Sequence, residues 1–399
     1  MKTQLIIFGL TGDLGRRKLI PALESLLGEH IKTDNLEVIG ISRREVDTDD
    51  ILAQSLGNDA KNSQISSILS FHQMDLAEVE DYKSLKKKLS QDEKTQILLY
   101  LSVPPTSAAK ISELAGRAGL NTPNVKILFE KPFGIDLASA ESFLSGTHEY
   151  FDESQILRVD HYLAKKSVRN LAGIFEQNEI LKSARELKQI EKVEIIASEK
   201  IDIEGRGIFY EQTGALRDFI QGHLTEILAV ILAENNKNMR NSRAEALENL
   251  KSIVDVREQT KRAQYIGYRE ESGSLKSFIE TFASVQLFSS EEKWRNIPFY
   301  LISGKALSEK KSEVAIYFAG SKKPLRVDLA EQPEDIQPYA QAFLDAIEGR
   351  NNFFVSEREI LASWRIFDEI LQDWDFNGEN GLEFYEKGIC HKNIETFSI

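Results

Sequence analysis

Residues 158–171, with the sequence RVDHYLAKKSVRNL, gather an acid, an imidazole, a phenol and several cations in one short run. If a helix begins near His161, Lys165 lies four residues on, on the same face. The unpaired N–H groups and the dipole of a helix start attract anions, so the run could hold a phosphate group. The alternative is an ordinary helix start, in which Asp160 is an N-cap and Lys165 faces water.

A second chemically suggestive run stands near the N-terminus, where IIFGLTGDLGRRKL carries Gly9, Gly12 and Gly15. Glycines permit a tight turn between a strand and a helix, and they let backbone N–H groups approach a pyrophosphate. The spacing is G-x-x-G-x-x-G, whereas the standard dinucleotide form is G-x-G-x-x-G. Taken alone, the run is explained equally well as a structural turn.

The end of the next apolar run favours one nicotinamide cofactor over the other. An enzyme that selects NAD needs an acidic residue there to hold the ribose hydroxyls. This sequence instead reads ISRRE, which places Ser42, Arg43 and Arg44 where they suit a 2′-phosphate. NADP is therefore favoured and NAD is kept as the weaker alternative. The competing explanation of the two arginines is a solvated loop.

Two patterns of elements must position these residues. Over residues 1–160, continuous apolar runs alternate with helical stretches, which is typical of a parallel sheet covered on both faces. Beyond them, strands follow one another without intervening helices. We predict a Rossmann-like, doubly wound α/β domain over 1–160 and an α+β substrate-binding domain with a mainly antiparallel sheet over 161–399, with a long helix over 213–234. Strands are expected at 4–8, 36–41, 70–74, 96–101, 125–129, 155–159, 191–200, 284–288, 299–303, 313–318 and 324–329.

The bulk composition narrows the classes of protein. The chain has 399 residues and a formal net charge of -13, and an acidic chain disfavours nucleic-acid partners. Cys390 is the sole cysteine, so no disulfide framework and no metal site are predicted. The apolar run Leu5–Leu10 suits a first strand better than a signal peptide, and no run is long enough to span a bilayer. We expect a cytoplasmic protein without a membrane partner.

Six motifs in order resemble the glucose-6-phosphate dehydrogenase family: GLTGDLGRRKLIPAL, YLSVPPT, FEKPFG, RVDHYLAKKSVRNL, EGRGIFYEQTGALRDFIQGHL and FYLISGKAL. The resemblance covers residues 4–320 and returns in YAQAFLDAI and SWRIF. It implies NADP-dependent oxidation of C1 of glucose 6-phosphate to 6-phosphogluconolactone, the first step of the oxidative pentose phosphate pathway.

The resemblance implies that His223 is the catalytic base and that Asp160 orients it. Oxidising a hemiacetal requires removal of the hydroxyl proton as hydride leaves the carbon, and an imidazole titrates in the right range. The carboxylate would fix the tautomer and stabilise the protonated ring. Without the resemblance, a core histidine on an apolar helix would be the better explanation of His223.

The ligand contacts are likewise implied by the resemblance. Glu199 and Asp218 would accept hydrogen bonds from sugar hydroxyls, which is where sugar selectivity arises. Lys18 and Lys305 are explained equally well as surface lysines. The residues implied to hold glucose 6-phosphate are His161, Tyr162, Lys165, Glu199, Asp218, Lys131 and Lys305. Those implied to hold the cofactor are Gly9, Thr11, Gly12, Asp13, Leu14, Lys18, Arg43, Arg44, Pro104 and again Lys131.

One implied pairing is in tension with helix geometry. Asp218 and His223 are five residues apart, so on an ideal α-helix their side chains point ~140° away from each other. Both border one pocket only if the pocket wraps around the helix or the helix is distorted.

The chain also departs from the family pattern. Lys166 stands where the family usually has a glutamate, which adds positive charge beside the phosphate site. The strand N-E-L-x-I-R-x-Q-P is absent, and the segment between SGKALSEKK and YAQAFLDAI is short. Because this sheet forms much of the family's dimer interface, dimerisation is left open.

Two other functions would explain parts of the sequence. A two-domain sugar dehydrogenase of the group that shares E-K-P would leave RVDHYL and EGRG unexplained. A non-catalytic relative that binds NADP or a sugar phosphate would be favoured by loss of His223 or Asp160, but both are present.

Overall fold

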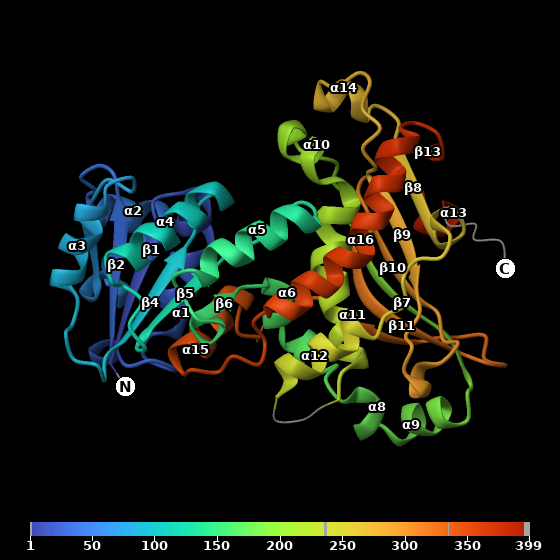
Figure 1. The fold of residues 1–399 in the computed structure, drawn as a ribbon, viewed down its shortest axis with the longest axis horizontal. Coiled ribbons are helices and arrows are strands. Elements are labelled where there is room, and N and C mark those ends of the chain that lie inside the picture. The colour runs from blue at the N-terminus through green and yellow to red at the C-terminus, as the bar shows by residue number, and fades with distance from the viewer. Residues whose placement is uncertain (1, 235–237, 334, 395–399) are drawn as a thin grey trace. The chain divides into compact units, whose positions relative to one another are not determined.

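The computed structural model describes residues 2–234, 238–333 and 335–394, with elements labelled as in Figure 1. The chain forms two compact units. The first comprises Met1–Gly134, Ala138–Lys165 and Glu334–Glu357, and the second comprises Ile135–Leu137, Lys166–Pro333 and Arg358–Ile399. The predicted division into domains 1–160 and 161–399 stays a prediction. Among the described residues, no helix has both the length and the apolarity that crossing a membrane requires.

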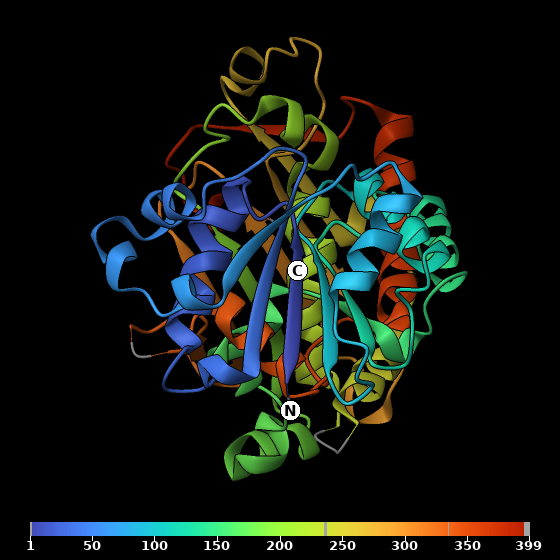
Figure 2. The same cartoon turned by 90° about the vertical axis from the view of Figure 1, so that its left-hand side faces the viewer.

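The first unit contains a six-stranded sheet in which every pairing is parallel, in the order β3-β2-β1-β4-β5-β6. Figure 2 shows these strands fanning side by side. The predicted doubly wound sheet is confirmed, because each apolar run became one strand. The strands are β1 (Thr3–Phe8), β2 (Leu36–Ser42), β3 (Leu69–Gln73), β4 (Gln96–Leu101), β5 (Val125–Phe129) and β6 (Ile156–Arg158).

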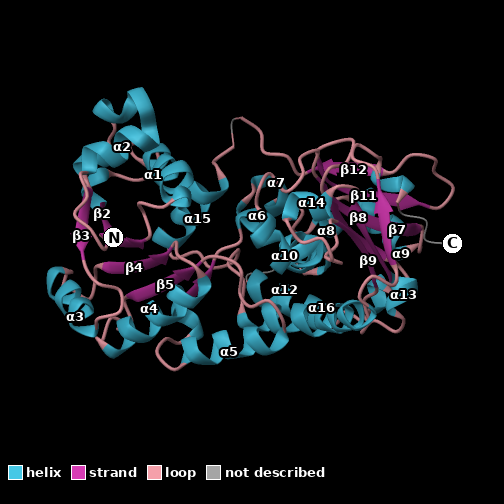
Figure 3. Cartoon of the chain, turned by 90° about the horizontal axis from the view of Figure 1, so that it is seen from above, coloured by secondary structure: helices cyan, strands magenta, loops and turns pink. Residues whose placement is uncertain are grey.

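Helices cover both faces of this sheet: Figure 3 shows α1, α2 and α15 on one face and α3 and α4 on the other. The strand order reverses at β1, which pairs with both β2 and β4, and ligands of such sheets bind at this switch point. The helical elements are α1 (Ile20–Leu26), α2 (Thr48–Leu56), α3 (Val79–Lys88), α4 (Pro105–Arg117), α5 (Leu137–His148), α6 (His161–Ala164) and α15 (Pro338–Ile347), with short turns η1 (Gly15–Leu19), η2 (Thr33–Asn35), η3 (Gly57–Asn62), η4 (Ile65–Ser67) and η5 (Glu153–Gln155).

Helix α15 packs with the first unit although it lies far along the chain. The Phe343 ring lies 5.1 Å from that of Tyr100, and the Gln96 side chain donates to the Ala346 carbonyl at 3.0 Å. Local sequence carries no sign of this return, because the contacts join residues almost 250 positions apart.

The second unit contains a seven-stranded sheet in the order β12-β11-β7-β10-β9-β8-β13. Most neighbours are antiparallel, as predicted, but β10 pairs parallel with β7 and β13 parallel with β8. β8 and β13 were not predicted. The strands are β7 (Ile190–Ser198), β8 (Thr260–Tyr265), β9 (Phe282–Leu287), β10 (Phe299–Gly304), β11 (Lys311–Phe318), β12 (Leu325–Asp328) and β13 (Leu382–Tyr385).

The predicted helix over 213–234 is wrong as a continuous element. Gly214, near the end of α10, has φ 60 and ψ -177, which breaks the helix, and residues Leu216–Leu224 then form a π-helix, η6. The α-helical hydrogen-bond pattern resumes only in α11. The helical elements of this unit are α7 (Lys166–Arg169), α8 (Ile174–Gln177), α9 (Glu179–Glu186), α10 (Gly207–Ala215), η6 (Leu216–Leu224), α11 (Thr225–Leu232), α12 (Met239–Glu248), α13 (Val256–Gln259), α14 (Tyr268–Ser272), η7 (Glu292–Trp294), α16 (Glu357–Asn377) and η8 (His391–Asn393).

Candidate active site

The glycine run forms a tight turn directly after β1. Gly9 has φ +84, and a Cβ there would overlap the carbonyl oxygen of Ser102, so this position requires glycine. The Gly12 amide donates to the Gly9 carbonyl at 2.9 Å and closes the turn. The chain then enters the short π-helix η1 and continues as α1.

A hollow of about 850 Å³ opens beside this turn, at the carboxyl ends of β1, β2 and β4. Its volume falls within the range of small-molecule and cofactor sites. A tight turn with glycine at positions 9 and 12, beside such a hollow, fits a dinucleotide. The predicted residues that line it are Gly9, Thr11, Gly12, Arg43, Arg44 and Pro104.

Sequence reasoning missed part of this lining. Asp75, Leu76 and Ala77 follow β3, and Lys110 and Ile111 lie on α4. The carboxyl ends of parallel strands meet at one edge of the sheet, so the residues after β3 could have been found from the predicted strand order.

Three predicted cofactor residues do not line the hollow. Asp13 and Lys18 are exposed, and Asp13 lies 3.7 Å from the Arg17 guanidinium. Leu14 packs against the core of the first unit. Their contacts with a cofactor stay predictions.

We expect Gly9→Ala to raise the KM for the nicotinamide cofactor by about tenfold or more and to destabilise the chain by ~1–3 kcal/mol, since the methyl group meets Ser102 in a strained backbone region. Steady-state kinetics and thermal unfolding would check this. Gly57→Ala is the matched control, because Gly57 also has positive φ but a Cβ there meets no atom within 4 Å. If only the unfolding of the Gly9 variant changes, the turn shapes the fold and not the cofactor site.

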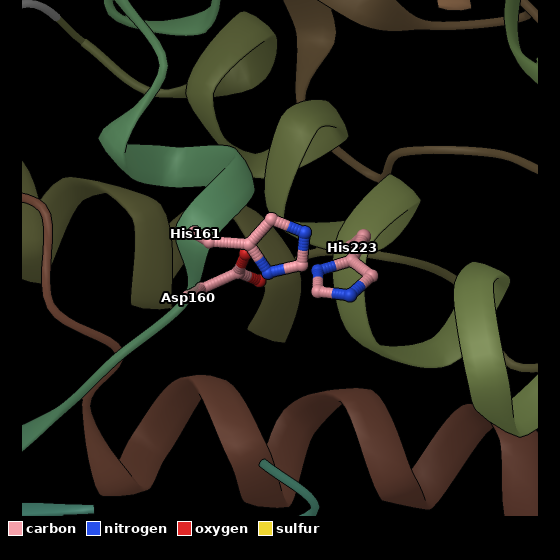
Figure 4. Close-up of side chains that lie close together, drawn as sticks. All are labelled: Asp160, His161 and His223. Carbon is pink, nitrogen blue, oxygen red and sulfur yellow. The ribbon is translucent and has the colours of Figure 1, made fainter. Parts of the chain in front are cut away.

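Asp160 caps the short helix α6. One carboxylate oxygen accepts from the Tyr162 amide at 2.7 Å and the other lies 2.5 Å from the Lys131 ammonium group. Its side chain is wholly buried. The N-cap role weighed as the ordinary alternative is therefore real, and the ion pair adds to it, so Asp160 is held in one orientation. Figure 4 shows Asp160 and His161 at this helix start.

Lys165 does not occupy the position expected from an extended helix. α6 ends at Ala164, and Lys165 has an extended backbone with φ -63 and ψ 133. Its ammonium group lies 3.8 Å from the centroid of the Tyr162 ring, and the residue is only 8% exposed. The alternative of a solvated helix lysine is therefore wrong. The ammonium group of Lys165 reaches the Tyr162 ring because the chain leaves the helical conformation at Lys165, and not because the two residues share a helix face.

A partly buried carboxylic acid that was not predicted as a site residue, Glu130, directly precedes Lys131 in the chain. Burial raises the pKa of Glu130 to about 7, and the negative charge of Asp160 adds to the rise, whereas a hydrogen bond from Tyr100 and the Lys131 charge oppose it. The Tyr339 ring of α15 stacks on His161 with centroids 6.0 Å apart. The position of Glu130 directly before Lys131 in FEKPFG was the available signal.

In the second unit, the π-helix η6 removes the tension between Asp218 and His223. Hydrogen bonds of a π-helix join residues five apart, so these two side chains lie one turn apart on one face. Burial raises the pKa of Asp218, while the charges of Lys305 and His223 lower it. His223, drawn on η6 in Figure 4, is 8% exposed and lies against Phe219.

Glu199 and Lys305 are brought together by two neighbouring strands. β7 and β10 run parallel in a register that pairs Ser198 with Gly304, so the residues that follow them are adjacent. The Lys305 ammonium group forms an ion pair with the Glu199 carboxylate and lies 5.5 Å from the centroid of the Tyr210 ring. Lys305 is 3% exposed, so the surface-lysine explanation is wrong for it.

The structure therefore assembles two groups of predicted residues. In the first unit these are Lys131, Asp160, His161, Tyr162 and Lys165. In the second unit they are Asp218 and the three residues whose charges act on it: Glu199, His223 and Lys305. The predicted dyad takes His223 from one group and Asp160 from the other, and it stays a prediction.

Comparison with known proteins decides the family. The model described as "Glucose-6-phosphate dehydrogenase, NAD binding domain" matches residues 6–170, and the C-terminal domain model of the same family matches 175–334 and 321–393. The chain belongs to the glucose-6-phosphate dehydrogenase family. Its first unit accordingly carries the nicotinamide-dinucleotide-binding domain of an oxidoreductase.

Two relatives in the glucose-6-phosphate dehydrogenase family resemble the whole chain. The glucose-6-phosphate 1-dehydrogenase of Helicobacter pylori (strain ATCC 700392 / 26695) is 30% identical over 421 residues, which cover 98% of this chain and 97% of that protein. The enzyme of Dickeya dadantii (strain 3937) is 30% identical over 453 residues, which cover 94% and 92%.

Solved glucose-6-phosphate dehydrogenase structures share the fold. The enzyme from Mycobacterium avium is 27% identical, with a TM-score of 0.85 over 100% of this chain and 97% of that one. A myo-inositol 2-dehydrogenase from Lactobacillus plantarum reaches a TM-score of 0.58 at 14% identity, over 94% and 98% of the two chains, which shows a shared fold alone. The family match excludes the other two-domain sugar dehydrogenases considered from the sequence as the chain's own family.

Proposed function

We propose that the protein oxidises glucose 6-phosphate at C1 to 6-phosphogluconolactone and passes hydride to NADP. One observation carries the proposal: Asp218 and His223 stand five residues apart on the π-helix η6, which puts them on one face, and the charges of His223, Lys305 and Glu199 all act on Asp218. A base, two hydroxyl-binding carboxylates and a cation are the groups that a sugar dehydrogenase needs. The family match and the relatives' activity, given by their names, support the same reaction.

In this mechanism His223 accepts the proton of the C1 hydroxyl. The O–H electrons form the lactone C=O bond, and the C1–H electron pair leaves as hydride. The bound nicotinamide supplies the hydride acceptor. Asp160, held by Lys131 and by the Tyr162 amide, orients the imidazole and stabilises its protonated form. A base whose pKa lies near neutrality takes and releases this proton most efficiently.

The phosphate is held by His161, Tyr162 and Lys165. The Tyr162 ring holds the Lys165 ammonium group close to its face, so this cation loses little entropy on binding an anion. The sugar hydroxyls pair with Asp218 and Glu199. Lys305 neutralises the Glu199 carboxylate, and Lys131 neutralises that of Asp160. Selection of one hexose would arise from these directional bonds.

NADP is the proposed cofactor because Arg43 and Arg44 line the cofactor hollow after β2. Replacing both with alanine is expected to lower kcat/KM for NADP by about 10- to 100-fold and to change that for NAD by less than about threefold, because each arginine bonds only a 2′-phosphate. Initial rates with both cofactors would measure the ratio. Arg17→Ala, an exposed arginine with a partner in Asp13, is the control. An unchanged NADP/NAD ratio would remove this assignment.

The reaction is tested by following reduced nicotinamide with glucose 6-phosphate, with glucose, and with each oxidised cofactor. Turnover of the phosphorylated sugar alone is expected. Binding of glucose 6-phosphate without turnover would instead favour the non-catalytic relative. A cytoplasmic location stays a prediction, and whether the chain forms a homodimer stays open.

A further inference from the structure

We propose that Glu280 is a positioning residue for the sugar-binding face of η6. It touches no proposed ligand group. Its carboxylate caps the start of the helix that carries Asp218 and His223, and the same short segment also holds the backbone of Lys305. The inference rests on the proposed function, because it assumes that these three residues bind glucose 6-phosphate.

The contact to the helix start is direct. Oε1 of Glu280 accepts from the Leu216 amide at 2.8 Å, and the Glu280 carbonyl accepts from the Ala215 amide at 3.0 Å. The first amides of a helix have no partner within the helix, and Leu216 is completely buried, so solvent does not supply one. Glu280 therefore satisfies two donors at the point where η6 begins.

The kink before η6 is shaped around this carboxylate. Gly214 has φ +60, and a Cβ there would overlap the carboxylate oxygens of Glu280. A glycine at this position thus serves two purposes: it permits the left-handed backbone and leaves room for the acid. Because the kink sets the direction in which η6 starts, Glu280 sets where Asp218 and His223 point.

The residue after Glu280 connects to the other side of the proposed sugar site. The Thr281 carbonyl accepts from the Lys305 amide at 2.9 Å, and the Tyr385 hydroxyl donates to the Lys305 carbonyl at 2.7 Å. The Lys305 side chain pairs with Glu199. Residues 280 and 281 therefore hold the start of η6 and the backbone of Lys305 at a fixed spacing.

The cap depends on an acceptor oxygen more than on a full charge. Glu280 is 3% exposed, and burial raises its pKa to about 7, although the Leu216 amide and the charges of Arg217 and Arg262 oppose the rise. A neutral side chain of the same length keeps the acceptor. This separates Glu280→Gln from Glu280→Leu in a test.

Glu280→Leu is expected to raise the KM and the Kd for glucose 6-phosphate about tenfold or more, since a buried amide loses its partner and η6 shifts. The KM for NADP should stay within about twofold. Glu280→Gln is expected to restore sugar binding to within about threefold of the unmodified protein, because it keeps the acceptor. Steady-state kinetics and calorimetric titration with glucose 6-phosphate measure these values.

Glu211→Leu is the matched control. Glu211 lies on α10, three residues before Gly214, and accepts from the Tyr268 hydroxyl at 2.6 Å, so its loss removes an acceptor without touching the start of η6. Its KM values should stay within about threefold. If the leucine variant at 280 does not fold, Glu280→Asp decides, because it keeps the charge and withdraws the acceptor; a rise in KM for the sugar alone is expected.

Equal rises in both KM values, or a leucine variant that binds glucose 6-phosphate as the unmodified protein does, would overturn the proposal. An aspartate variant with normal sugar binding would do the same. Calorimetry requires no turnover, so this failure is distinct from failure of the proposed reaction, in which the unmodified protein itself would not convert the bound sugar.

Discussion

His223→Asn is expected to lower kcat by about 10²- to 10⁴-fold while the Kd for glucose 6-phosphate changes by less than about threefold, since asparagine cannot accept the hydroxyl proton. His223 is 8% exposed and lies on the same face of η6 as Asp218, so the smaller asparagine should leave the sugar-binding groups in place. Single-turnover rates and calorimetric titration would measure the two quantities separately.

Two results bear on the base assignment. His30→Asn, an exposed histidine of the first unit, should keep its full rate. Raising the pH should not restore the kcat of His223→Asn, because the asparagine side chain does not become a proton acceptor at any pH of the assay. A variant with near-normal kcat would show that another group accepts the proton.

Lys165→Ala is expected to raise the KM for glucose 6-phosphate by about 30- to 100-fold, because a charge-assisted bond to phosphate is lost from a buried site. The KM for NADP should change by less than about threefold. Lys165 is only 8% exposed and its ammonium group lies over the Tyr162 ring, so truncation to alanine removes this cation from a buried position. Initial-rate measurements that vary each substrate in turn would check this.

The adjacent lysine provides the control for charge. Lys166→Ala removes the same charge one residue on, at an exposed position, and should raise the KM for the sugar phosphate by no more than about threefold. If both variants weaken sugar and cofactor equally, Lys165 stabilises the fold and does not select phosphate.

Several elements were predicted correctly because their signals are local. Each apolar run of the first domain became a parallel strand, and the glycine run became a turn that excludes a side chain at Gly9. Asp160 caps α6, which the sequence offered only as the alternative to its role beside His223. The resemblance implied Glu199 and Lys305 as site residues, which stays a prediction, and the parallel pairing of β7 with β10 explains why these two residues, 106 positions apart, meet.

Other features could not be predicted, because they depend on contacts between distant segments. β8 and β13 lack a clear apolar alternation and pair with each other across more than 110 residues. An α-helix was expected where η6 is a π-helix, since nothing local distinguishes the two. The burial of Glu280 and the raised pKa of Glu130 could likewise not be predicted, because a glutamate in a sequence says nothing of what packs around it.

The amino-acid sequence alone determined the parallel sheet, the glycine turn and the family. Hydrophobic periodicity, turn residues and ordered motifs can each be recognised from residues that are neighbours in the chain. Tertiary structure decided that α15 packs in the first unit and that α6 ends before Lys165. It also decided that Asp218 and His223 share one face of η6. These outcomes depend on which backbone groups find partners once the chain is packed, and Glu280 at the start of η6 is the clearest case.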